Sequence, residues 1–219
     1  MSESAPTLIA ALPLWATAQL IADWWSDPTD TETGHVNVPE PVRSGEHSDP
    51  IGEVATAAAE LLGVDAETMS ALSAAIGDPT ALAEEYERLL VGPGQTSCPP
   101  YESMWYEDAP QQRGIMMGSA AGQVLALYRQ AGLTMRPHQG ELPDHLVVEL
   151  EALAWSLEQN RAPAVATALL NDHLLAWLPR FCERVVAETN HPYYRALATL
   201  TPTWTAAMAD RLERLDVEP

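Results

Sequence analysis

Apolar residues recur every three or four positions along most of this chain, which is the spacing of one face of an α-helix. Leu14, Ala18, Ile21 and Trp25 form such a face in a helix that we expect over residues 8–25, starting in earnest near Pro13. No stretch alternates apolar and polar residues as a strand bounded by turns would. The pattern therefore predicts an all-α fold.

The same periodicity, read together with helix-capping residues, predicts a series of further helices. They span, in order, 51–63, 65–76, 79–92, 111–131, 145–159, 164–189 and 192–215. Pro179 lies inside one of them and should kink it or split it in two. Gly114, Gly118 and Gly122 form a stripe on another. Each glycine costs roughly 1 kcal/mol relative to alanine, so the stripe favours close packing against a neighbouring helix.

Two segments interrupt the helical pattern. Residues 26–50 carry Asp, Thr, Pro, Gly, Glu and His without apolar periodicity, so we expect a long acidic loop or an insertion there. Residues 133–144 contain two prolines and are interpreted as a hinge between an N-terminal and a C-terminal lobe. A chain of 219 residues with 47% hydrophobic content can bury a sizeable core, and we predict a single helical domain over 1–219.

The charge restricts the possible partners. The formal net charge is −20, and every fixed positive charge is an arginine, because the chain contains no lysine. Nucleic acid requires clustered basic groups and is excluded as a partner, whereas a basic peptide is favoured. The absence of lysine is typical of compositional bias or salt adaptation, so a helical, salt-adapted interaction protein is one alternative function.

Cysteines and the N-terminal region point to a reducing compartment. Cys98 and Cys182 are far apart and match neither a zinc motif nor a disulfide framework. The first basic residue is Arg43, so the positive region of a secretory signal is missing. The apolar stretch 8–22 is too short to span a bilayer. We expect a soluble, cytoplasmic protein without stable membrane insertion.

The stretch 84–106 combines a helix end with a run of rings. Gly92-Pro93-Gly94 must stop the helix, because proline lacks an amide hydrogen and glycine accepts unusual backbone angles. Pro99 and Pro100 favour extended geometry. The aromatic residues that follow are Tyr101, Trp105 and Tyr106. A stiff segment bearing aromatic rings suits a recognition surface, and the alternative is that the rings fill space between helices.

A second candidate lies at Pro143-Asp144-His145. Asp144 is a natural N-cap for the helix that follows. His145 and Glu149 are four residues apart on one helical face, a spacing that could hold a metal ion or a proton carrier. A helical metal-dependent hydrolase using His145, Glu149 and His173 is therefore a second alternative function. A cap residue, a surface histidine and a solvated glutamate need no metal, and the zinc-protease motif His-Glu-x-x-His is absent.

Together these motifs resemble the TorD/DmsD/NarJ family of redox-enzyme maturation chaperones. The first runs from Glu85-Tyr86-x-x-Leu89-Leu90 through Gly92-Pro93 to Pro99-Pro100-Tyr101-Glu102-Ser103, and the second from Pro143-Asp144-His145-Leu146 to Glu149-Leu150-Glu151. Their order, their separation and the helical context agree, and the similarity covers residues 51–200. Leu90 stands where the family commonly has Phe, and residues 26–50 match nothing in the family.

The resemblance implies a non-enzymatic, all-α cytoplasmic chaperone without a cofactor, either a monomer or a homodimer. Such a protein binds the apo-form of a molybdopterin oxidoreductase catalytic subunit at its N-terminal, often twin-arginine, leader, and assists cofactor insertion, assembly and export proofreading. The peptide-binding residues that it implies are Tyr86, Leu89, Pro99, Pro100, Tyr101, Glu102, Ser103, Trp105, Asp144, His145 and Glu149. Carboxylates suit an arginine pair, and Tyr, Trp, Leu and Met suit the apolar middle of a leader. Guanine-nucleotide binding, associated with some members, cannot be assigned to any residue here.

Overall fold

The computed structural model describes residues 14–29, 36–37, 78–106, 118–136 and 142–217. The helices predicted over 51–63 and 65–76, and most of the predicted loop at 26–50, lie outside these residues. The single domain over 1–219 and the hinge at 133–144 stay predictions.

Helices account for nearly all of the regular structure in the described residues, as the sequence predicts. The α-helices are α1 (Leu14–Trp25), α4 (Pro79–Tyr86), α5 (Ser119–Gln130), α6 (Leu146–Leu157), α7 (Pro163–Ala168), α8 (Leu175–Glu188) and α9 (Pro192–Val217). Shorter 3₁₀ turns are η3 (Glu102–Met104) and η4 (Glu158–Asn160), and π-helical turns are η2 (Glu87–Val91) and η5 (Leu169–Leu174). The strands β1 (Val36–Asn37) and β2 (Thr134–Met135) pair antiparallel.

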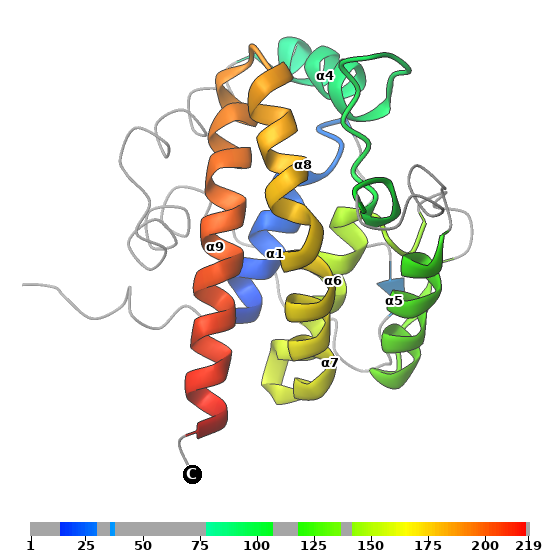
Figure 1. Ribbon diagram of the computed structural model, residues 1–219, viewed down its shortest axis with the longest axis vertical. Helices are drawn as coiled ribbons and strands as arrows, with labels where there is room; N and C mark the ends of the chain where they lie inside the picture. The colour runs from blue at the N-terminus through cyan, green and yellow to red at the C-terminus, as the bar shows by residue number, and fades with distance from the viewer. Residues whose placement is uncertain (1–13, 30–35, 38–77, 107–117, 137–141, 218–219) are drawn as a thin grey trace, which may run out of the picture.

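The two ends of the described chain pack together. Helix α9 lies beside α8 along one side of the molecule, and α1 packs against both α6 and α9 (Figure 1). Two indole hydrogen bonds join α1 to α9: Trp25 Nε1 donates to Thr201 Oγ1 at 3.0 Å, and Trp204 Nε1 donates to Thr17 Oγ1 at 3.1 Å. These tryptophans bury large apolar rings while satisfying their N–H groups, which fixes how the first and last helices dock.

Helix α6 is the centre of the core. All of its residues except Trp155 and Leu157 are buried, because α1, α7, η5 and β1 surround it. The leucine stripe in the sequence predicts burial of one face only. The expectation of a solvated Glu149 is therefore wrong, since this side chain lies on the buried helix and has no exposed area.

Two predictions about helix interiors also need correction. Gly118 has extended backbone angles and is the N-cap of α5, so the helix starts at Ser119. A Cβ placed on Gly122 would meet nothing within 4 Å, so this glycine does not mark close packing. Pro179 does not split the helix predicted over 164–189, because α8 continues through it, and a kink at this residue stays a prediction. The departure from α-helical geometry lies earlier, at η5.

Candidate functional site

The structure brings the aromatic loop and the hinge motif together. Tyr101 and His145 form an isolated antiparallel β-bridge. On either side of it, Leu146 N donates to Pro100 O at 2.8 Å and Glu102 N donates to Asp144 O at 2.9 Å. We call the paired segments 98–106 and 142–149 the loop–hinge junction. The two segments that carry the peptide-binding residues implied by the family resemblance therefore lie side by side.

Hydrogen bonds fix both helix α4, which precedes the loop, and the loop itself. Asp78 caps α4 by accepting a hydrogen bond from Ala81 N at 3.1 Å. At the far end of that helix, Cys98 N donates to Leu89 O at 2.6 Å, which draws the chain back onto the π-helical turn η2. Pro99 O then accepts from Trp105 Nε1 at 2.8 Å. The two prolines therefore lead into a short turn closed by its own tryptophan.

On the hinge side, the predicted cap residue is wrong by one position. His145 is the N-cap of α6, and its Nδ1 accepts from Val147 N at 3.3 Å. Asp144 Oδ2 instead accepts from Ser103 N across the junction at 3.1 Å. The backbone bridge to the loop turns Asp144 towards Ser103, and the imidazole of His145 takes over the cap.

Three carboxyl groups meet below the junction. Glu102, Asp144 and Glu149 each have 0% exposed area, and we call them the buried carboxyl cluster. Burial raises the pKa of both Tyr106 and Tyr128, and all three acids raise it further because a phenolate beside them would be repelled. Three acids in one interior are costly unless they are paired or neutralised.

His173 supplies the pairing for Glu102. Its Nδ1 lies 2.9 Å from each of the two Glu102 carboxyl oxygens, and the Tyr106 hydroxyl donates to Glu102 Oε1. The His173 side chain comes from η5, a π-helical turn that places it among buried leucines. The sequence pattern suggests a role for His173 only as a third metal ligand. A signal for its role exists, because His173 lies four residues before the buried Trp177 on the apolar face of the predicted helix.

The pKa of the Glu149 carboxyl group is raised, which favours its neutral form. Burial, followed by the charge of Glu102, raises its pKa well above the usual 4.5, and a hydrogen bond from Trp177 Nε1 at 3.3 Å opposes this only in part. Three buried oxygens around it have no hydrogen-bond partner in the described part of the chain: Ser103 Oγ, Asp144 Oδ1 and Glu149 Oε1.

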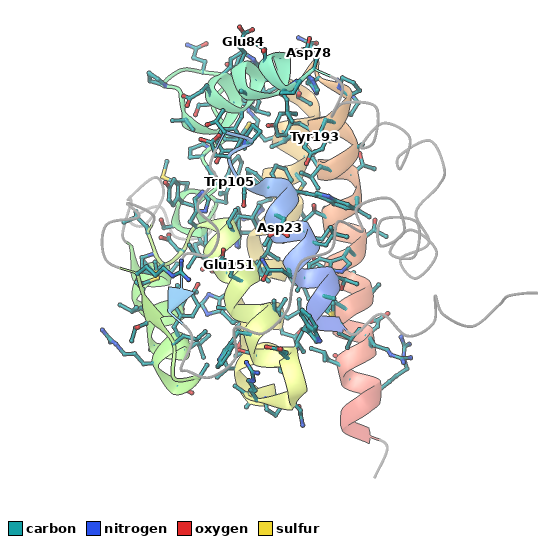
Figure 2. The ribbon with its side chains drawn as sticks, turned by 180° about the vertical axis from the view of Figure 1, so that it is seen from behind. Asp23, Asp78, Glu84, Trp105, Glu151 and Tyr193 are labelled. Carbon is teal, nitrogen blue, oxygen red and sulfur yellow. The ribbon has the colours of Figure 1, made fainter. Side chains whose placement is uncertain are left out.

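The remaining predicted site residues divide between core and surface. Leu89 and Tyr86 are buried in the core, at 0% and 6% exposure, where they support the loop from beneath. Tyr101 and Trp105 are half-buried. Trp105, which is labelled in Figure 2, packs edge-on against Phe181 with ring centroids 5.6 Å apart. The rings are thus neither free recognition groups nor simple core filler, because each is partly exposed while it contacts the core or the hinge.

The described residues also bear on metal binding and on membrane insertion. Within them, no three His, Cys, Asp or Glu side chains are arranged to hold a metal ion. In the same part of the chain, none of the helices has the length and apolar character needed to cross a membrane.

Comparison with known proteins identifies the family of this chain. The profile of the family described as "Nitrate reductase delta subunit" matches residues 52–183. The chain belongs to this family. The membership confirms the resemblance found in the sequence, because the TorD and DmsD chaperones are among the relatives of the chain.

Three relatives of the chain are chaperones by name. A "Tat proofreading chaperone DmsD" from Salmonella typhi is 28% identical over 139 residues, which cover 63% of this chain and 66% of that protein. A "Chaperone protein YcdY" from Escherichia coli is 30% identical over 139 residues, covering 62% and 67%. A "Chaperone protein TorD" from a Shewanella species is 29% identical over 136 residues, covering 61% and 64%. The alignment with the first of them thus spans just under two thirds of its length.

A crystal structure from Archaeoglobus fulgidus, provisionally described as a redox enzyme maturation protein, aligns with 97% of this chain and 99% of that one. The sequence identity is 22% and the TM-score is 0.48.

Proposed function

We propose that this protein is a non-enzymatic cytoplasmic chaperone that binds the N-terminal leader of a molybdenum-cofactor oxidoreductase subunit before the cofactor is inserted. The observation that carries the proposal is the loop–hinge junction, which brings half-buried rings and the buried carboxyl cluster together in the same two segments. The names of the three relatives support it, since each is a chaperone and one proofreads for the Tat pathway.

The two layers of the junction suit the two parts of such a leader. Tyr101, Met104, Trp105 and Tyr106 are partly exposed and offer apolar surface for the middle of the peptide. Glu102, Asp144 and Glu149 offer carboxyl oxygens, which bind guanidinium groups through charge-assisted hydrogen bonds. Recognition therefore combines ring contacts above with charge pairing below.

The fold supports a binding role for this surface. The junction is built from backbone bonds between segments about forty residues apart, so the loop cannot move independently of the hinge. We propose that residues 1–219 form one domain and that the hinge at 133–144 transmits leader binding from one lobe to the other.

Calorimetric titration with synthetic leaders of the molybdenum oxidoreductases encoded in the same genome tests the function. We expect saturable binding of one leader, weakened about tenfold or more by Asp144→Asn with Glu149→Gln, because each lost charge-assisted hydrogen bond is worth about 1.5–3 kcal/mol. Asp172→Asn with Glu183→Gln is the matched control: it removes two exposed acids, and binding should change little. Failure of every leader, and of the apo-subunits, to bind refutes the proposal.

A further inference from the structure

We propose, resting on the function above, that an arginine of the bound leader enters the buried carboxyl cluster in exchange for a proton carried by Glu149. Leader capture is then coupled to proton release, and affinity becomes a function of pH.

The cluster accepts several hydrogen bonds, yet three oxygens in it and beside it are left without a partner within the described part of the chain. Ser103 Oγ, Asp144 Oδ1 and Glu149 Oε1 have no hydrogen-bond partner in the described residues, and their side chains are at most 2% exposed. An unpaired buried polar atom costs about 1–3 kcal/mol, so three around one site is an arrangement that a ligand would relieve. A guanidinium carries five N–H donors and no acceptor, which is the complement of these three oxygens.

The surroundings of Glu149 explain why the proton is there in the free protein. Glu102 and Tyr106 face it from the loop and Asp144 from the turn before α6. Tyr128 faces it from α5, and from α8 the indole of Trp177 does so. His173 on η5 is bonded to Glu102 rather than to Glu149.

Among the described elements packed against α6, α1 and α7 bring no cation to Glu149, while α6 itself carries a further buried acid, Glu151. Helix α1 carries one titratable residue, Asp23, and its side chain is exposed, while α7 carries none. Acids therefore predominate around Glu149 in the described residues, and they raise the pKa of its carboxyl group and so favour the protonated form.

The exchange leaves the charge of the interior unchanged. The O–H bond of the Glu149 carboxyl breaks, the proton passes to solvent buffer, and the guanidinium enters with its own positive charge. No oxidant or further reactant is needed. The exchange adds no net charge to the low-dielectric interior. Burying an uncompensated charge there is the main free-energy cost of binding a cationic side chain in the core.

The cluster also lies close to the surface. Glu102 and Ser103 are buried, but their chain neighbours Tyr101 and Met104 are partly exposed. A side chain as long as arginine can reach past rings at this depth while its peptide backbone stays outside.

The test counts protons. Titrations of the full-length protein with its leader, in two buffers of different ionisation enthalpy, give the number of protons released. We expect close to one proton per leader at acidic pH, and an affinity that rises about tenfold per pH unit until Glu149 of the free protein ionises. A leader with both arginines replaced by lysine should bind with less proton release, because the compact ammonium group lacks the planar fork of N–H donors that can span separate fixed acceptors.

Variants separate this exchange from a structural role. Glu149→Gln should abolish the proton release and flatten the pH dependence while binding falls about tenfold or more. Asp172→Asn, beside His173 but exposed, should keep both. Leader binding by the unmodified protein without proton release overturns the exchange and leaves the chaperone function standing. Absence of binding by any leader overturns both.

Discussion

Single side chains in this protein are placed against their ordinary preferences. Glu102 is fully buried and depends on His173 and Tyr106 for its hydrogen bonds. Glu149 accepts a hydrogen bond from the Trp177 indole, and its raised pKa favours the neutral form. Buried acids without full pairing cost stability, and their retention in a core suggests that the cost serves binding.

The raised pKa of Glu149 predicts how stability depends on pH. The folded protein holds this proton more tightly than the unfolded chain, so the contribution to stability is complete below the unfolded pKa of about 4.5 and is lost as pH rises towards the folded value. Within that window, the free energy of unfolding of wild type relative to Glu149→Gln should fall by about 1.4 kcal/mol per pH unit. Urea unfolding at several pH values measures the difference, and a constant difference from about pH 5 to about pH 8 contradicts it.

Irregular helical turns position the site at the scale of elements. The π-helical turn η5 carries His173 inward to Glu102, and the π-helical turn η2 ends where Gly92 N bonds to Glu87 O. Such turns are rare and are common at functional sites, because one extra residue per turn redirects the side chains that follow. Here they direct a histidine into the cluster and the chain into the aromatic loop.

Two glycine substitutions test these element boundaries in opposite directions. A Cβ on Gly92 would lie 2.9 Å from the backbone oxygen of Glu87, so Gly92→Ala should destabilise the protein by about 1–3 kcal/mol. Gly122 is exposed in the middle of α5 with open space around it, so Gly122→Ala should stabilise by about 0.5–1 kcal/mol. Thermal unfolding measures both, and destabilisation by Gly122→Ala would restore the close packing that its sequence spacing suggests.

The whole molecule is dominated by negative charge. A formal net charge of −20 acts over distances well beyond any one contact, so it steers a cationic leader towards the surface. The buried carboxyl cluster, by contrast, is shielded from salt because water and ions do not reach it. Surface charge and cluster should therefore act on different stages of binding.

Rapid-mixing kinetics of leader binding separate these two stages. Raising the salt concentration should slow association, by about tenfold or more between low and physiological ionic strength, because long-range attraction is screened. Dissociation should change much less, since it depends on buried contacts. In the Asp144→Asn, Glu149→Gln variant, dissociation should be faster than in the wild type. Salt should slow its association as much as in the wild type. An association rate insensitive to salt argues against steering.

The sequence by itself determined the all-α class, the family and the two motifs, because helical periodicity, capping residues and proline positions are local properties of the chain. It also indicated that Tyr101 and His145 belong to one site. Only the tertiary structure decided that Glu149 is buried, that His145 rather than Asp144 caps α6, and that His173 pairs with Glu102. These facts depend on packing of α6 on every side and on a π-helical turn, which arise from contacts between distant segments and leave no periodic signal in the sequence.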